Sequence, residues 1–152
     1  MKGKRYVIRQ ATIDDIDCLA ELLSELFSIE KSFTINKLKQ KAGLSLLIDN
    51  KNSVVLVAEK NNRIIGMVTG QLVVSTAEGG FSVLLEDMSV SGKYRRKGVG
   101  SDLLETLASW GFRKGAKRIQ LLADRTNDPA IAFYVDHDFS RSNMEGLYCA
   151  LP

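Results

Sequence analysis

Apolar residues recur every three to four positions along the first third of the chain. Over residues 13–30 they form one helical face, and Thr12 with Asp15 has the spacing of a capping box at its start. A second helical pattern covers residues 38–48, with Thr34 as its candidate N-cap. The chain is therefore predicted to contain two consecutive amphipathic helices before any large sheet.

The middle of the chain changes to the composition of strands. Runs rich in valine and other β-branched residues are separated by short polar turns, which predicts three successive antiparallel strands. Together with shorter runs near both ends, the strands expected are residues 6–8, 53–59, 63–75, 81–90, 118–123 and 139–150.

Two further helices are predicted in the second half. Residues 100–114 carry an apolar stripe, and Gly115 is placed to end that helix. Asp128 can cap a helix whose first residue is Pro129, and this helix should run to about residue 137.

The order of these elements defines a fold class. The helix over residues 100–114 connects two strands, and such a crossover implies a parallel pair. The prediction is an α/β (α+β) fold with a mixed, mostly antiparallel central sheet of about six to seven strands, flanked by about four helices. Residues 1–152 are expected to form a single domain, a usual size for one hydrophobic core.

Composition narrows the class of protein. The chain is 45% hydrophobic and 26% charged with a net charge of +3, which fits a globular protein and argues neither for nucleic acid nor for membrane binding. It has no secretory signal and no apolar run of transmembrane length, so a cytoplasmic location is predicted. Cys18 and Cys149 lack metal-ligand spacing, so we expect buried reduced thiols and no metal.

One stretch, KYRRKGVGSDLLE at residues 93–105, combines four cationic residues with two glycines at the start of a helical pattern. Gly98 and Gly100 let the backbone approach a ligand, and the N–H groups that open a helix favour a phosphate-sized anion. The stretch matches neither a Walker A loop, which needs Lys-Ser or Lys-Thr after its second glycine, nor a Rossmann fingerprint, which needs a third glycine. A solvated basic turn remains the alternative on this stretch alone.

Two motifs together resemble the GNAT superfamily of N-acetyltransferases. The central motif of that superfamily is Gln or Arg, two residues, Gly, one residue, then Gly or Ala, and Arg95, Gly98 and Gly100 match it. The preceding LLEDMSVSGKY is similar to the strand and loop that lead into this motif, and NDPAIAFYVDHDF is similar to the second motif of the family. Asp138 stands where that second motif usually has glycine. The resemblance spans roughly residues 53–139.

This resemblance implies acetyl-CoA as cosubstrate, without a metal. It implies backbone pairing with the pantetheine arm along a strand that splays from its parallel neighbour, and a pyrophosphate site at the start of the following helix. The implied cofactor contacts are Met88, Ser89, Val90, Arg95, Arg96, Lys97, Gly98, Val99, Gly100, Ser101, Asn127 and Tyr134.

The resemblance also implies catalytic roles. The family counterpart of Tyr134 protonates the departing thiolate, a transfer that is uphill by roughly 1.5 pKa units for an ordinary tyrosine and thiol. Glu86 or Asp87 is the candidate base for the amine, although a regular strand would turn only one of the two toward the acceptor. Glu30 is a weaker candidate for binding the acceptor, and His137, the single histidine, is expected to be structural.

The expected activity is direct transfer of an acetyl group from acetyl-CoA to a primary amine of a small molecule, a peptide or a protein. The alternative is a CoA-binding sensor or interaction module of the same fold without turnover. A nucleic-acid binder that uses KYRRK is disfavoured because no recognition helix or RNA-binding aromatic motif is present. The last expected strand could pair in a homodimer.

Overall fold

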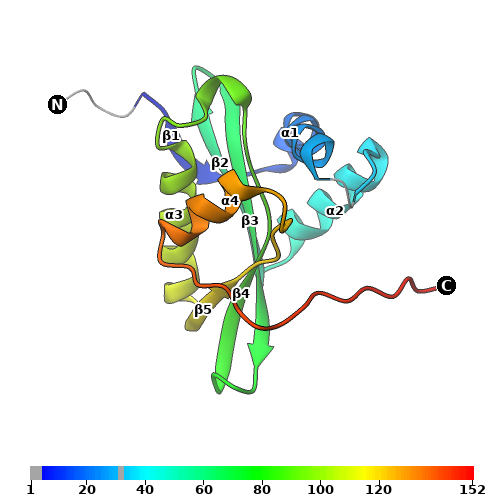
Figure 1. The fold of residues 1–152 in the computed structure, drawn as a ribbon. Coiled ribbons are helices and arrows are strands. Elements are labelled where there is room, and N and C mark those ends of the chain that lie inside the picture. Colours follow the sequence, from blue (N-terminus) through cyan, green and yellow to red (C-terminus); the bar gives the residue numbers. More distant parts are fainter. Residues whose placement is uncertain (1–4, 31–32) are drawn as a thin grey trace. The chain divides into compact units, whose positions relative to one another are not determined.

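The computed structural model describes residues 5–30 and 33–152 (Figure 1). In chain order the elements are β1 (Val7–Gln10), a 3₁₀ turn (Ile13–Asp15), α1 (Ile16–Ile29), α2 (Lys37–Asp49), β2 (Ser53–Lys60), β3 (Arg63–Ser75), β4 (Gly80–Val90), a 3₁₀ turn (Gly92–Tyr94), α3 (Val99–Arg113), β5 (Ala116–Gln120) and α4 (Asp128–Val135). The chain divides into two compact units, Met1–Leu121 and Leu122–Pro152. A single domain over residues 1–152 stays a prediction.

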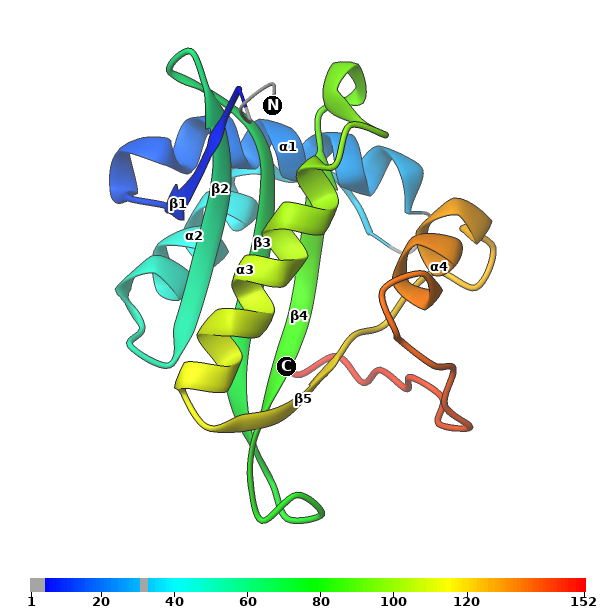
Figure 2. The same ribbon diagram turned by 90° about the vertical axis from the view of Figure 1, so that its left-hand side faces the viewer.

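The first unit contains a mixed sheet in the order β1-β2-β3-β4-β5. The first three pairs are antiparallel, and β4 with β5 is parallel. In Figure 2, α3 crosses one face of this sheet while α1 and α2 cover the other. The predicted α/β class, the three antiparallel central strands and the parallel crossover are thereby confirmed.

Both faces of the central strands are buried, which explains why β2 is a continuous apolar run. Val55, Val57 and Met67 pack with α1 and α2 on one face. On the other face α3 lies very close to the sheet, because a Cβ added at Gly70 would lie 2.4 Å from Leu107 Cδ1. The absence of a side chain at Gly70 thus sets how near α3 can lie.

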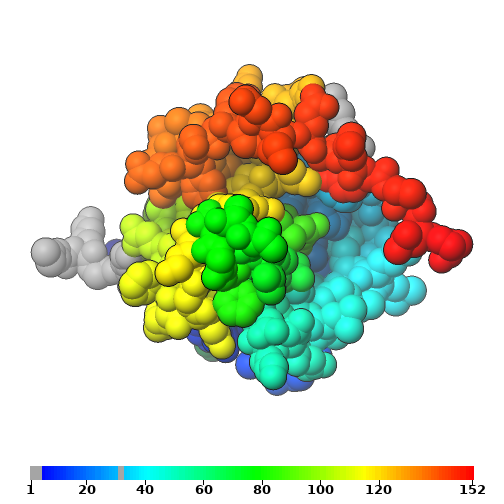
Figure 3. Space-filling view, turned by 90° about the horizontal axis from the view of Figure 1, so that it is seen from below, coloured from blue at the N-terminus to red at the C-terminus, as the bar shows by residue number. Residues whose placement is uncertain are grey.

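A second close approach joins the start of α3 to the end of β4. A Cβ added at Gly66 on β3 would lie 3.2 Å from Val99 Cγ1 and 3.3 Å from the Ser89 carbonyl oxygen. The first residue of α3 and the last residues of β4 therefore meet at one place on β3. Figure 3 looks at the opposite end of the sheet, where the β3–β4 hairpin (green) lies beside the segment that ends α3 and begins β5 (yellow).

The helix starts differ in detail from the sequence prediction. The capping box is confirmed, with the Thr12 N–H donating to Asp15 Oδ2 at 2.8 Å, but it opens a 3₁₀ turn before α1. Asn36 rather than Thr34 caps α2, because its Oδ1 accepts from the Lys39 N–H at 3.1 Å. Each cap lies where an Asx or hydroxyl side chain reaches an unpaired helix N–H, and several neighbouring residues can do so.

The start of α4 and the cysteines also need correction. Asn127 caps α4 through a 3.2 Å hydrogen bond from the Ala130 N–H, so Asp128, predicted to be the cap, is the first helical residue. Cys18 and Cys149 are free thiols, but both are exposed rather than buried. Cys18 lies on α1, where a small side chain fits the solvent face as well as the core.

Residues 139–150 do not form the predicted strand. They have no regular secondary structure, so the sheet has five strands among the described residues rather than six or seven. A strand exists only where a neighbour pairs with its backbone, and this segment carries Asn143 and Gly146 and no hairpin partner of its own. Weak alternation in sequence was insufficient to predict a strand.

The end of α4 carries a backbone feature that yields a stability prediction. Asp138 has φ +66°, and the Phe139 N–H donates to the Tyr134 carbonyl while the Asp138 N–H donates to that of Val135, which together form a Schellman motif. Glycine adopts this left-handed conformation without the Cβ penalty, so Asp138→Gly should raise the unfolding free energy by about 1 kcal/mol in urea denaturation. Asp136→Gly, at φ −64°, should lower it. Equal shifts in both variants would contradict this explanation.

Candidate active site

A β-bulge interrupts β4 near its middle. The register with β3 runs from Gly70 opposite Leu85 to Val68 opposite Met88, so Glu86 and Asp87 together face the single residue Thr69. The Asp87 N–H donates to Thr69 Oγ1 at 3.1 Å, in place of a ladder hydrogen bond. The strand thus contains one extra residue at the two candidate carboxylates.

This extra residue changes which side of the sheet the later side chains face. Val83 contacts Gly111 on the α3 side, since a Cβ there would lie 2.7 Å from Val83 Cγ2. Ser89, an even number of residues later, instead donates its Oγ proton to the Leu22 carbonyl of α1 at 3.1 Å. In a regular strand both would share one face. The strand is therefore not regular here, so the condition under which at most one of the two carboxylates would face the acceptor is not met.

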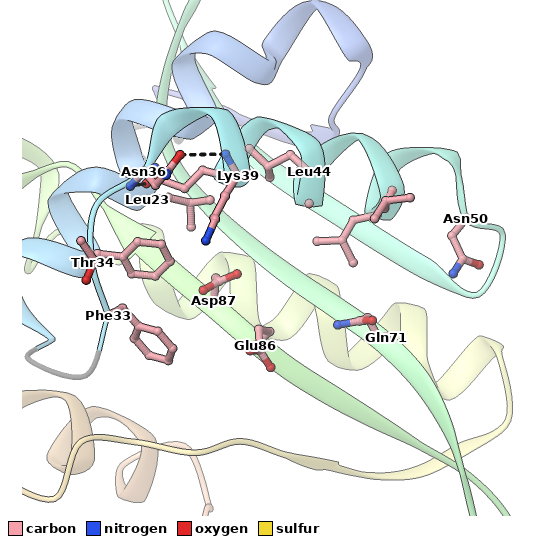
Figure 4. A pocket seen from close by; sticks show the side chains of 15 residues that line it. Leu23, Phe33, Thr34, Asn36, Lys39, Leu44, Asn50, Gln71, Glu86 and Asp87 are labelled. Carbon is pink, nitrogen blue, oxygen red and sulfur yellow. Dashed lines mark hydrogen bonds between the residues drawn. The ribbon is translucent and has the colours of Figure 1, made fainter. Parts of the chain in front are cut away.

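Glu86 and Asp87 both line one pocket of about 500 Å³, formed by α1, α2, the segment between them, β3 and β4 (Figure 4). Much of the remaining lining is apolar, and it comes from helices that no chemical motif identified. The apolar lining residues are Leu23, Phe27, Phe33, Leu44, Leu46 and Leu47. The helical periodicity of those on α1 and α2 indicates core packing alone, and no sequence pattern singles out Phe33.

Asp87 is electrostatically unusual. Burial raises the pKa of Asp87 to about 7, and the negative charges of Glu86 and Glu30 add to the effect. A carboxyl with this pKa exchanges a proton readily near neutral pH, which is the property of a general base or acid. Glu86 is exposed and lines the same pocket. Its negative charge disfavours the loss of a proton from Asp87.

The glycine loop turns into α3 through residues with left-handed backbone conformation. Gly98 is the N-cap of α3 with φ +84°, and Arg96 is also left-handed with φ +61°. The first intrahelical hydrogen bond runs from the Asp102 N–H to the Gly98 carbonyl, so the N–H groups of Val99 and Gly100 precede the ladder of the helix. Gly98 is exposed, and the positive end of the α3 dipole lies at the same end of the helix.

Two of the four cationic side chains of this loop hydrogen-bond to backbone carbonyls, and the other two are exposed. Arg95 Nε donates to the Val90 carbonyl at 2.8 Å, and Lys97 Nζ donates to the Lys93 carbonyl at 2.7 Å, so both also brace the loop. Lys97 also lies 5.7 Å from the ring centre of Tyr94. Arg96 and Lys93 are exposed. All four keep positive charge beside the helix start.

The edge of β4 that faces β5 is open beyond the middle of the strand. The parallel pairing ends at Leu84 opposite Gln120, although β4 continues to Val90 (Figure 2). Met88, Ser89 and Val90 therefore lie on a stretch with a ladder to β3 and none to β5. This is the separation of the parallel pair that the resemblance implied, and it leaves backbone groups available to a ligand.

Tyr6, which sequence patterns did not single out, supports the loop from β1's side. Its hydroxyl donates to Asp102 Oδ2 in the first turn of α3, and its oxygen would lie 3.9 Å from a Cβ at Gly98. Burial raises the pKa of Tyr6 to about 12, with the Asp102 carboxylate adding to it. A tyrosine 96 positions away gives no sequence signal of this contact, since only the fold brings the two together.

Asn127 and Tyr134 lie in the second unit, on α4 and its cap. Tyr134 packs edge-on against Phe133, with ring centres 5.3 Å apart, and at 5.4 Å from the Phe139 ring. His137 Nδ1 lies 2.7 Å from the Phe133 carbonyl oxygen and its ring lies 4.3 Å from that of Phe133, so the histidine takes part in local packing. The roles of Asn127 and Tyr134 toward a cofactor stay predictions.

Neither a metal-binding cluster nor a membrane-spanning helix is found within residues 5–30 and 33–152. No three His, Cys, Asp or Glu side chains are grouped so that they could hold a metal ion. None of the helices in this part of the chain has both the length and the apolar character needed to cross a membrane.

Comparison with known proteins decides the family. The model of the acetyltransferase (GNAT) family matches residues 18–139. The chain belongs to this family. Members of the family transfer acyl groups, so the protein is an acyltransferase by descent, and both sequence motifs lie inside the matched range.

Individual relatives and solved structures resemble the chain over nearly its whole length. An uncharacterized N-acetyltransferase, YhfO of Bacillus subtilis, is 26% identical over 142 residues, which cover 93% of this chain and 95% of that protein. An aminoglycoside acetyltransferase from a soil metagenome, solved with sisomicin, has a TM-score of 0.80 at 22% identity and covers 97% of each chain. Aminoglycoside N-acetyltransferase AAC(6')-Iy, solved with CoA, has a TM-score of 0.84 at 17% identity, with 98% of this chain and 97% of that one covered. These last two likenesses concern the fold.

Proposed function

We propose that the protein transfers the acetyl group of acetyl-CoA directly to a primary amine. The observation that carries the proposal is that α3 begins, with the left-handed turn at Gly98, beside the open edge of β4. A backbone edge and a helix N-terminus in this arrangement suit a ligand that carries amides at one end and phosphates at the other.

The residues present fit such a ligand. The N–H groups at Val99, Gly100 and Ser101 and the charges of Arg95 to Lys97 would hold the pyrophosphate, and Met88 to Val90 would pair with the pantetheine amides. Asn127 would contact the same arm. When bound, acetyl-CoA supplies an activated thioester carbonyl. A structural neighbour of the family fold was solved with CoA, which agrees with this assignment.

Two residues, Asp87 and Tyr134, would transfer protons in the proposed reaction. A lysine-like ammonium is mostly protonated at neutral pH, and Asp87, with its pKa of about 7, would accept that proton directly or through water. Glu86 would bind the ammonium and keep the pKa of Asp87 high. Tyr134 would hold the proton that the departing thiolate takes up. No acyl-enzyme is required, because amine and thioester react directly.

Release of free thiol from acetyl-CoA, followed with a panel of primary amines, tests the proposal. Turnover that depends on the amine is expected. Tight binding of CoA with no turnover on any amine would instead identify a CoA-binding module of the same fold.

A binding prediction tests the pyrophosphate site separately. Gly98→Ala should raise the dissociation constant of acetyl-CoA by about tenfold or more, because a Cβ at φ +84° strains the turn and enters the anion site. Titration calorimetry measures it.

Gly115→Ala is a matched control at the other end of α3. Gly115 has φ +82°, and no atom lies within 4 Å of the place that a Cβ would take, so this variant carries similar backbone strain away from the proposed site. Its stability should fall by about 1 kcal/mol, while its affinity for acetyl-CoA stays unchanged. Equal affinities of the Gly98 and Gly115 variants would place the pyrophosphate elsewhere.

A further inference from the structure

The pocket that Glu86 and Asp87 line has one apolar side and one acidic side. Six leucine and phenylalanine side chains of α1, α2 and the segment between them line it, and the rings of Phe27 and Phe33 lie 5.4 Å apart. Glu86 and Asp87 come from β4 on the opposite side (Figure 4). Glu30 adds negative potential at Asp87 and so strengthens the same end.

Most neutral polar side chains of the pocket are already occupied. Gln40 Nε2 donates to the Ala20 carbonyl and its Oε1 accepts from the Asn36 N–H, at 2.9 and 2.8 Å. Asn36 caps α2, and Asn50 Oδ1 accepts from the Asn52 N–H at 2.8 Å. These groups shape the wall. The charged side chains therefore dominate what an acceptor meets.

Lys39 is the single cation among the described residues that line the pocket. The neighbouring lysines of α2 are paired with α1, Lys37 with Glu21 at 2.5 Å and Lys41 with Asp17 at 2.7 Å. The Lys39 ammonium makes no hydrogen bond or ion pair with the part of the chain that the structure describes. In Figure 4 its side chain extends from α2 toward β4.

We infer that the acceptor is a primary amine that carries a single positive charge on an apolar body, and that Lys39 selects against acceptors with a second ammonium group. This inference rests on the proposed function, since it takes the pocket as the acceptor site. One ammonium group is bound by the carboxylates of β4, and the apolar body lies along the leucines and phenylalanines. A second ammonium would meet a hydrocarbon wall and the like charge of Lys39.

The inference separates this protein from its structural neighbours that are named for aminoglycosides, which carry several ammonium groups. A polycation needs carboxylates distributed along its length. Here the two lining carboxylates are adjacent residues on one strand, and the rest of the lining offers one ammonium, apolar carbon and neutral polar groups but no further carboxylate.

Two amines of equal size test it. Heptylamine and hexane-1,6-diamine have the same number of non-hydrogen atoms and differ by a terminal methyl against a terminal ammonium. We expect the wild-type protein to bind heptylamine about tenfold more tightly by calorimetry with CoA present, and to prefer it by a similar factor in kcat/KM. Lys39→Glu should move both ratios toward the diamine by at least about tenfold.

Lys41→Glu is the matched control, because it makes the same charge change on the same helix at a residue that does not line the pocket. It should leave both ratios unchanged. The inference is overturned if the diamine binds as well as heptylamine, or if the two lysine variants behave alike. The proposed function fails separately, if neither these nor other amines are acetylated. In that case the binding ratio still decides whether the pocket prefers an amine with a single positive charge.

Discussion

Asp87→Asn should lower kcat/KM for an amine acceptor by about a hundredfold or more at pH 7, the usual size of a general-base contribution. Asparagine keeps the shape of the side chain, and the hydrogen bond from its backbone N–H to Thr69 does not depend on the carboxylate. What the variant loses is a proton acceptor with a pKa of about 7. Initial rates of thiol release, measured between pH 5 and 9, check this.

The pH profile should identify the group responsible. The wild-type rate should rise as Asp87 loses its proton around pH 7, and this limb should be missing in Asp87→Asn. Glu86→Gln removes a neighbouring negative charge, so the limb should move to lower pH. A limb that stays at pH 7 in Asp87→Asn would assign the base to another residue.

The stability of Asp87→Asn at different pH values controls for misfolding of the variant. The folded-state pKa of Asp87 is raised above its unfolded value of about 3.9, so its contribution to stability is fully present below that pH and is lost as the pH rises through about 7. Above pH 7 the wild-type protein bears a buried charge that Asp87→Asn lacks. The variant should therefore unfold at higher urea concentration than wild type at pH 8, while its activity is lower.

Tyr134→Phe should lower kcat by about a hundredfold and leave the affinity for acetyl-CoA within a few-fold of wild type. Phenylalanine preserves the ring contacts with Phe133 and Phe139, so packing in the second unit is retained. What the variant lacks is the hydroxyl proton that the departing thiolate would take up. Steady-state kinetics on any accepted amine, with calorimetry for acetyl-CoA, separate the two effects.

Tyr148→Phe is the matched control, because Tyr148 is a strongly exposed tyrosine of the same unit outside both motifs. Its kinetic constants should be those of wild type. If Tyr134→Phe retained full kcat, Tyr134 would be a packing residue, and the leaving thiolate would have to be protonated by water or another group.

The elements with contiguous signals could be predicted from sequence. The glycines, the cations and the apolar stripe of α3 lie within residues 93–113, so a local pattern was sufficient to predict both the turn and the helix. The parallel pairing of β4 with β5 followed from the crossover rule. Helix caps were less predictable, because Asn36 and Thr34, or Asn127 and Asp128, are chemically equivalent caps a residue or two apart.

The arrangement of the candidate site depends on strand pairing and helix packing, which no local sequence pattern reveals. The bulge at Glu86 and Asp87 is defined by how β4 pairs with β3, and Thr69 occupies the place of the missing ladder partner. Phe27, Phe33 and Lys39 appeared to be ordinary helix and loop residues until α1 and α2 were placed over the sheet. The strand expected over residues 139–150 failed for the same reason, since pairing and not alternation makes a strand.

The sequence alone therefore determined the family, the order of most elements and the glycine turn at the start of α3, because these depend on residues close together in the chain. The tertiary structure decided that Glu86 and Asp87 line one pocket, that Lys39 lines the same pocket, and that the pKa of Asp87 is about 7. Burial and the distance between charges set these properties, and both depend on residues that only folding brings together.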